Sequence, residues 1–466
     1  SIRHLEKNFR IISKEMRTGL IDGLFGFFLI ALEIIAIFLY GFYFKHVNEG
    51  DTNVSPLFTM VSDFFPYYQD LHILVFMGFA LLLTSFHKFR TSAIVQCFWV
   101  CALSVQFYFL WRVFWTEIFE ADKFQAKNFN IDPMVLIKSD FCALSMIIAI
   151  SATMGKANDF QALGITILGV GLYALNEVIC LSKVATNAVD FGGSMIVHTF
   201  GAFYGIGVTL LLRYNNKSLS KPVLPNSFEH QITSLIGTIF IWCYWPSYNS
   251  SLVVSETTTF KGILNTYFAL IASVVFAFAT SKLVIGSGKF SMYHVFHASL
   301  SGGVIMAASA VFVKDGYASY LVGSLIGILS TLYIHFVLPK LQAAGMLAIA
   351  PQLSLHAIPG LLGGFLSAIW VKSYTDLKAG NQVAATFISM GIGLFGGVIV
   401  GLIVRVFHDN EQNEQYQGFM TIAVEEQNED GYVVAAPVVA QAQPTTTQVI
   451  YTEAPHNHEE EQLKQQ

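Results

Sequence analysis

The sequence predicts an all-α polytopic membrane protein with twelve transmembrane helices. Of its 466 residues, 54% are hydrophobic and only 12% are charged, whereas soluble domains carry about 25% charged residues. The hydrophobic residues gather in runs that are long enough to cross a bilayer, and charged or turn-forming residues separate these runs. The composition therefore excludes a soluble enzyme or a nucleic-acid-binding protein.

Twelve apolar runs have the length of a membrane span, which is roughly 20 residues. The first eighteen residues carry five Lys or Arg and are too charged to form a cleaved signal peptide, so the run that follows is predicted to be the first transmembrane helix. The predicted spans are 19–44, 69–87, 91–115, 134–154, 160–182, 190–212, 230–251, 262–284, 290–312, 317–339, 346–371 and 384–407.

An even number of spans places both termini on the same side of the membrane. The basic N-terminus and the distribution of Lys and Arg among the loops predict that this side is the cytoplasm. The long loop 45–68 would then face outward, and it contains Asn53-Val-Ser55, the sequence at which N-linked glycosylation occurs. We therefore expect Asn53 to be a glycosylation site.

Three regions differ in composition: a cytoplasmic segment 1–18, the transmembrane domain 19–408 and a tail 409–466. The tail holds eleven acidic residues and one lysine and is rich in Gln, Glu, Pro and Thr, so it is predicted to be disordered in the cytoplasm and available to cytoplasmic partners. Its His456 and His458 are expected to be solvated. No spacing of Cys, His or acidic residues indicates a metal, and no cofactor is expected.

Two histidines lie deep within predicted spans. His198 follows Asp190 by eight residues, which in a helix is about 12 Å and hence near the middle of a ~30 Å hydrocarbon core. His356 lies at a matching depth in the eleventh span, which runs in the opposite direction. Either histidine alone could be a hydrogen-bonded core residue, but a matched pair on opposed helices favours a functional site at the midplane of an inverted repeat of five helices.

The stretches around these histidines resemble the Rh glycoproteins, a branch of the ammonium transporter superfamily. The resemblance covers about residues 20 to 408 and keeps the family's order of motifs. It rests on Pro66-Tyr-Tyr-Gln-Asp70-Leu-His72, Asp140-Phe141-Cys142, Asn176-Glu177, Gly192-Gly-Ser-Met-Ile-Val-His198-Thr-Phe-Gly-Ala202, Tyr244-Trp-Pro-Ser-Tyr-Asn-Ser250 and His356-Ala-Ile-Pro-Gly-Leu-Leu-Gly-Gly364.

The resemblance implies an eleven-helix core with an added N-terminal helix. It also implies a homotrimer in the plasma membrane with one ammonia pore in each subunit. His198 and His356 match the twin pore histidines of the family. Phe141 and Tyr248 match its paired aromatic gate, and Asp190 matches the carboxylate below the outer vestibule.

The sequence departs from the family pattern at three places. The second gate position is usually Phe, whereas Tyr248 adds a hydroxyl group. Ser291 and Ala348 stand where many Rh glycoproteins have carboxylates, so the inner mouth loses negative charge. His297 stands where an amide is common, close to His294, and the pair could either pack between helices or approach the inner vestibule.

These residue types suit ammonia transport. Moving a bare monovalent ion from water into a low-dielectric medium costs on the order of 20 kcal/mol, so an apolar pore excludes ions such as potassium. Ammonium can leave a proton behind and cross as ammonia, which needs hydrogen bonds that neutral imidazoles provide. Desolvation disfavours a charged imidazole, so we expect at most one of the two histidines to be charged. Aromatic faces at the gate, with Trp245 nearby, could attract ammonium.

Other charged residues near the spans have simpler interpretations. Asp190 could cap the helix that follows it, attract ammonium, or do both. Glu177, Asp140 and Glu33 are expected to pair or to accept hydrogen bonds away from the substrate. Arg112 is expected to extend its charged end toward the membrane surface.

Three functions remain open at this point. The first is an ammonia conduit, either electroneutral or coupled to charge, and the second is a conduit for carbon dioxide. The third is a scaffold without transport, which would have no need of both His198 and His356. An enzyme is the least favoured function, because the sequence shows no nucleophile–base pair, metal cluster or phosphate-binding loop.

Overall fold

The computed structural model describes most of the predicted membrane domain and two short pieces of the tail. The described residues are 24–44, 54–85, 90–119, 129, 131–154, 156–182, 187–212, 228–286, 288–343, 353–372, 377–407, 424–427 and 433–436. Asn53 and Ala348 lie outside these residues. The glycosylation of Asn53 and the effect of Ala348 on the charge of the inner mouth therefore remain predictions.

The first half of the membrane domain consists mainly of long helices, and its described part includes two π-helical segments. In chain order it comprises the helix Leu24–Tyr43, α2 (Val54–Ile73), η1 (Leu74–Gly78), α3 (Phe79–Leu83), α4 (Arg90–Phe119), α5 (Pro133–Thr153), α6 (Asp159–Leu181), η3 (Ser194–Thr199) and α7 (Phe200–Leu211). The second half comprises α8 (Phe228–Ser250), α9 (Glu256–Ile285), α10 (Met292–Ala298), α11 (Ser301–Met306), α12 (Gly316–Leu332), η4 (Tyr333–Val337), α13 (Leu338–Ala343), η5 (Leu353–Ala357), α15 (Ile358–Val371), α16 (Ala379–Val404) and η6 (Arg405–Phe407).

Ten helices in the described part of the chain are long and apolar enough to cross a membrane. The two predicted spans outside this set are 230–251 and 290–312. The first of them is the continuous helix α8, whose ends carry polar residues. In addition, the second span begins at Val61 rather than at residue 69, because residues assigned to the outer loop continue the helix.

The predicted continuous span 290–312 is wrong in its form, because α10 ends at Ala298, α11 ends at Met306, and the chain then runs through turns. Side chains of neighbouring helices hydrogen-bond to the backbone that the interruption exposes. Asn265 Nδ2 donates to the carbonyls of Ala310 and Val313 at 2.8 and 2.9 Å. Ser273 Oγ donates to Ser299 at 2.7 Å. Irregular backbone is tolerated at membrane depth only where protein supplies such partners.

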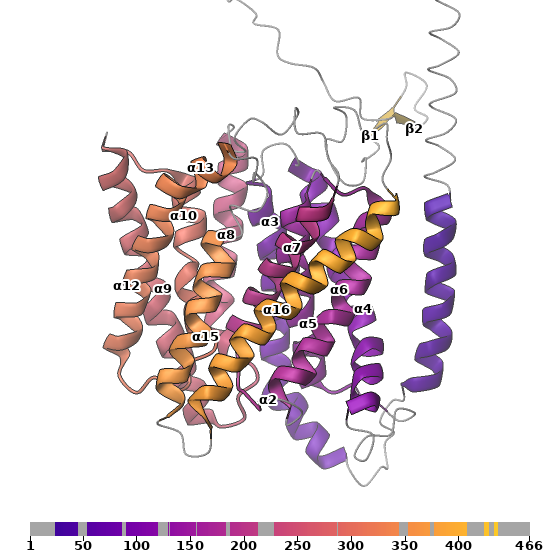
Figure 1. Cartoon of the computed structure of the whole chain (residues 1–466), viewed down its shortest axis with the longest axis horizontal. Coiled ribbons are helices and arrows are strands. Elements are labelled where there is room, and N and C mark those ends of the chain that lie inside the picture. Colours follow the sequence, from indigo (N-terminus) through magenta and orange to yellow (C-terminus); the bar gives the residue numbers. More distant parts are fainter. Residues whose placement is uncertain are drawn as a thin grey trace, which may run out of the picture. The chain divides into compact units, whose positions relative to one another are not determined.

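The helices stand side by side, and α16 slants across the bundle (Figure 1). α7 packs along α16, and α9 packs along α12. Small residues permit both close approaches, since a Cβ atom added at Gly397 would overlap the Tyr204 carbonyl and one added at Gly323 would overlap the Ala269 carbonyl. These two helix pairs are thereby held together by close backbone contact rather than by long side chains.

The first helix, Leu24–Tyr43, packs on α4 and leaves most of its apolar surface exposed. Tyr40 donates to the Gln106 carbonyl at 2.7 Å, and Gln106 Nε2 donates to Glu33 at 2.9 Å. Phe27 and Phe38 are 75% and 74% exposed. In a membrane protein this surface would face lipid.

The described part of the tail is a separate unit. Two strands, β1 (Val424–Gln427) and β2 (Val433–Ala436), pair in antiparallel fashion, with Val424 opposite Ala436. The predicted disorder of the rest of the tail concerns residues outside the described part and stays a prediction.

Candidate functional site

His198 and His356 occupy equivalent positions in two short π-helical segments. His198 lies in η3, directly before α7, and His356 lies in η5, directly before α15. In η3 the backbone N–H of His198 donates to the carbonyl of Gly193, five residues earlier, at 2.9 Å. Such single π turns widen a helix locally and occur frequently at functional sites.

The two imidazole rings face each other in register. Their Nδ1 atoms are 3.1 Å apart, the ring centroids are 5.2 Å apart, and the planes differ by 6°. Both side chains are buried. Because one Nδ1 must donate and the other accept, a neutral pair holds opposite tautomers and directs the two Nε2 atoms to other partners. The sequence predicted this pair, and the structure brings its members together.

Backbone contacts set the spacing of the pair. Ser194 Oγ donates to the Val304 carbonyl and accepts from the Ala308 N–H, both at 2.8 Å, so η3 is tied to the interrupted stretch after α11. Gly360 lies against η3, where an added Cβ atom would be 2.8 Å from the Ser194 carbonyl oxygen. The approach of α15 to η3 therefore depends on a residue without a side chain.

Three aromatic rings cover one side of the histidine pair. Phe141 of α5 and Tyr248 of α8 are buried and 4.6 Å apart, with 31° between their planes. Trp245 is stacked at 21° on the His198 ring, 5.8 Å away, and Tyr248 lies 6.2 Å from His198. The aromatic pair and the histidines thus form one continuous cluster, in which Phe141 and Tyr248 are in direct contact.

Asp190 lies before η3 and is buried. Its Oδ2 accepts the backbone N–H groups of Met195 and Ile196, both at 2.8 Å, as a capping carboxylate does. Its Oδ1 has no hydrogen-bond partner among the described residues. Asp190 therefore fixes the start of η3 and retains a second oxygen that could act electrostatically.

Several buried polar atoms in the aromatic cluster lack partners within the described part of the chain. They are His198 Nε2, Trp245 Nε1 and the Tyr248 hydroxyl. Buried polar groups are normally hydrogen-bonded, so a group of unpartnered atoms requires an explanation. These atoms suit a small molecule with both donor and acceptor capacity.

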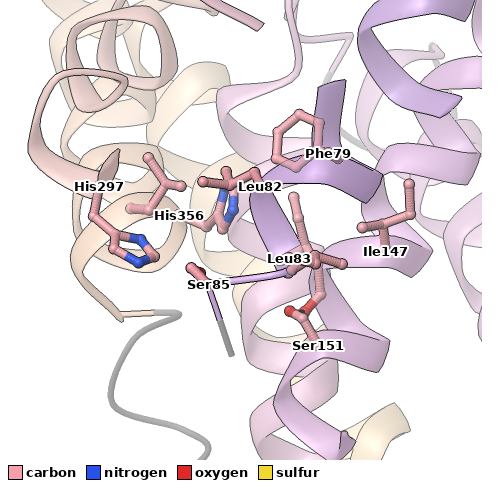
Figure 2. Close-up of a pocket in the computed structure, with 10 residues that line it drawn as sticks. Phe79, Leu82, Leu83, Ser85, Ile147, Ser151, His297 and His356 are labelled. Atoms are coloured by element: carbon pink, nitrogen blue, oxygen red, sulfur yellow. Dashed lines mark hydrogen bonds between the residues drawn. The ribbon is translucent and has the colours of Figure 1, made fainter. Parts of the chain in front are cut away.

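His356 also lines a cavity, to which His198 and the three aromatic residues do not contribute (Figure 2). Its apolar wall comes mainly from α3 and α5, and its polar lining consists of Ser85, Ser151, His297 and His356. Sequence reasoning missed Ser85 and Ser151, since single serines near helix ends carry no recognisable signal. It named His297 but left open whether that residue packs or lines the path.

His294 and Ser291 lie away from this cavity lining. His294 Nδ1 is 2.9 Å from Ser281 Oγ, which also accepts the backbone N–H of Ser291 at 2.9 Å. His294 therefore joins α10 to α9, and Ser291 is the N-cap residue directly before α10. Of the two neighbouring histidines, the structure places only His297 in the cavity wall.

The remaining charged residues form pairs within the bundle. Arg112 and Lys138 contact Glu177 at 3.0 and 3.3 Å, and the Tyr108 hydroxyl donates to Glu177 at 2.7 Å. The prediction that Arg112 extends to the membrane surface is therefore wrong: its guanidinium turns inward to a buried carboxylate. Asp140 lies 3.2 Å from His72 Nδ1, in agreement with the expected pairing.

Comparison with known proteins identifies the family. A family model described as "Ammonium Transporter Family" matches residues 27–428. The chain is similar to "Ammonium transporter Rh type C-like 2" of Danio rerio, with 31% identity over 409 residues, which covers 80% of this chain and 82% of the relative. It is also 30% identical over 409 residues to "Ammonium transporter Rh type C" of Homo sapiens, covering 80% and 84%.

A solved structure, that of Nitrosomonas europaea Rh50, has the same fold, with a TM-score of 0.68 and 24% identity over 78% of this chain and 94% of the other. The buried histidine pair, the ordered motifs and these similarities agree. This multi-pass membrane protein therefore belongs to the ammonium transporter family and, within it, to the Rh branch.

Proposed function

We propose that this protein conducts ammonia across a membrane through a path that His198 and His356 line. The observation that carries the proposal is the contact between the two parallel rings, whose Nδ1 atoms are 3.1 Å apart. The aromatic cluster adjoins His198, and His356 lines the cavity. The relatives named ammonium transporters support ammonium as the substrate.

Ammonium would be recruited at the aromatic end. The faces of Trp245, Phe141 and Tyr248 attract a cation there, and the free oxygen of Asp190 adds negative charge. An ammonium ion then gives one proton to water or to a group at this end and enters as neutral ammonia. The proton stays behind, and charge and atoms balance because NH₄⁺ yields NH₃ and H⁺.

The histidine pair lowers the cost of carrying ammonia through an apolar path. Burying an amine without hydrogen bonds costs several kcal/mol, roughly 4–8 on hydrocarbon scales. Each neutral imidazole offers a donor or an acceptor at Nε2 while the two Nδ1 atoms hold the rings together. A hydrated ion gains no comparable compensation, so potassium is excluded.

The finer features of the assembly are also proposals. The histidine-bearing segments η3 and η5, each followed by a helix, support an inverted repeat within an eleven-helix core. We infer that the aromatic end faces outward, that both termini are cytoplasmic, and that the protein forms a homotrimer in the plasma membrane with Asn53 glycosylated.

Flux into proteoliposomes tests the proposal. Vesicles that contain the protein are mixed with ammonium chloride, and an internal pH dye reports entry of ammonia as alkalinisation. We expect the internal pH to rise clearly faster than in empty vesicles. When potassium chloride replaces ammonium chloride, we expect the protein not to change the internal pH. Equal rates with and without protein would overturn the proposal and favour a scaffold. If carbon dioxide acidifies vesicles with protein faster than empty vesicles, the protein would instead be a conduit for carbon dioxide.

A further inference from the structure

We propose that His297 is a third pore histidine, which together with Ser85 holds one ammonia molecule in the cavity beyond His356. The inference rests on the proposed function and adds a binding site to it. His297 comes from α10 and His356 from η5, and both line the same cavity (Figure 2).

The first observation is that His297 is buried but its ring makes no hydrogen bond to any described residue. Both Nδ1 and Nε2 are without a partner, although the side chain is only 5% exposed. A histidine that served packing alone would leave one donor and one acceptor unpaired, which costs about 1–3 kcal/mol for each group. Neighbouring His294 shows the packed alternative, because its Nδ1 bonds Ser281 Oγ.

The second observation is that another unpartnered polar atom lines the same cavity. Ser85 Oγ is buried and has no hydrogen-bond partner within the described residues. By contrast, Ser151 Oγ, which also belongs to a residue of the cavity lining, donates to the Ile148 carbonyl at 2.7 Å. Two residues with free hydrogen-bonding atoms therefore stand among walls that are otherwise mainly aliphatic or aromatic.

The third observation concerns size. The cavity has a volume of about 20 Å³. One water-sized molecule needs roughly 10–15 Å³ on this measure. Ammonia is of that size and carries one acceptor and three donors, which match an imidazole with one donor and one acceptor and a hydroxyl with both. The lining contains no Asp, Glu, Lys or Arg, and much of it is apolar, from Phe79, Leu82, Leu83 and Leu355. Such a cavity disfavours a cation.

The ring of His297 is also held in place. It packs at 4.5 Å on the ring of Tyr293, one helical turn earlier, with 52° between the planes. α10 ends at Ala298, so His297 is the second-last residue of this helix and lines the cavity from its end. The imidazole of His297 is thus a binding group with a fixed position. Ammonia that leaves His356 forms hydrogen bonds to His297 and Ser85 before it reaches water.

The test compares His297→Phe, which keeps a ring of similar size without nitrogen, with His297→Asn, which keeps a donor and an acceptor. We expect His297→Phe to lower the ammonia flux per protein about tenfold, the factor that one lost hydrogen bond accounts for. His297→Asn should stay within about twofold to threefold of the natural protein. His294→Phe, outside the cavity lining, is the matched control and should leave the flux unchanged.

A loss of flux in His297→Asn as large as in His297→Phe, or natural flux in His297→Phe, would overturn the third site while leaving the proposed function intact. If the natural protein carries no flux above empty vesicles, both fail together. Ser85→Ala decides the matter should His297→Phe fail to fold. This substitution removes only the hydroxyl group, and we expect it to lower the ammonia flux per protein twofold to fivefold. An unchanged flux in Ser85→Ala would contradict the proposed site.

Discussion

The Tyr248 hydroxyl lies in the aromatic pair without a hydrogen-bond partner among the described residues. We therefore expect Tyr248→Phe to raise the free energy of unfolding by about 1 kcal/mol, because it removes a buried unpaired group while keeping the ring. Thermal unfolding of the purified protein in detergent measures this change.

Tyr204→Phe is the matched comparison. The Tyr204 hydroxyl is equally buried but donates to the Ile165 carbonyl at 2.7 Å. Its removal should lower the free energy of unfolding by about 1 kcal/mol. A loss of stability in Tyr248→Phe as large as in Tyr204→Phe would show that the gate hydroxyl has a protein partner.

Single residues show what the sequence could reveal about the site. His198 and His356 were predictable because each lies deep in an apolar run and within a long recognisable motif. The environment of His297 was not, because it depends on where α10 ends and on which residues of α3 and α5 meet it. Nothing in the sequence near Ser85 links it to a histidine more than 200 residues later.

Among the elements, α4, α5 and α6 are joined by a buried ion cluster around Glu177. We expect Glu177→Gln to lower the free energy of unfolding by about 3–5 kcal/mol, because Arg112 and Lys138 would keep their charges with no carboxylate between them. Chemical or thermal unfolding measures this loss.

Glu256→Gln provides the control, since Glu256 is an exposed residue in the first turn of α9, at the end of the helix. A surface change of this kind should alter stability by no more than about 0.5 kcal/mol. Equal effects of the two substitutions would contradict a structural role for the cluster.

The contact between η3 and α15 gives a second prediction at this scale. Gly360→Ala places a Cβ atom 2.8 Å from the Ser194 carbonyl and 3.1 Å from the Thr199 backbone nitrogen, so the two segments must separate. We expect a loss of about 1–3 kcal/mol and a lower ammonia flux, since His356 moves with its segment.

Gly391→Ala in α16 is the matched control, because an added Cβ atom there meets nothing within 4 Å. It should be neutral or stabilise the helix by up to about 1 kcal/mol. Normal stability and flux in Gly360→Ala would show that the spacing of the histidines tolerates a wider contact.

Hydropathy located the helices well but could not show their interruptions. Ser273 stabilises the break between α10 and α11, and Asn265 stabilises the turns that follow α11; both residues come from α9. The π-helical segment η3 is likewise tied to the backbone at Val304 and Ala308, more than a hundred residues later, through Ser194. Local sequence patterns do not predict partners that are so distant in the chain.

At the scale of the whole molecule, the last described residue of the membrane domain, Phe407, is held by residues at the start of α6. Asn158 Nδ2 donates to the Phe407 carbonyl at 2.7 Å, and Phe160 stacks on Phe407 with 6.0 Å between ring centroids. We therefore expect removal of residues 409–466 to leave the flux per protein in proteoliposomes unchanged. A large loss of conductance in the shortened chain would assign the tail a part in the pore.

The measurement that tests the central claim most directly records ammonium-driven pH change and membrane current together, in natural protein and in a His198→Ala, His356→Ala double variant. We expect the natural protein to pass ammonia and exclude potassium, and the double variant to lose flux at least about tenfold or to admit charged ions, since two hydrogen-bonding groups leave the path. Unchanged flux and unchanged ion exclusion in the double variant would show that ammonia does not pass between these histidines.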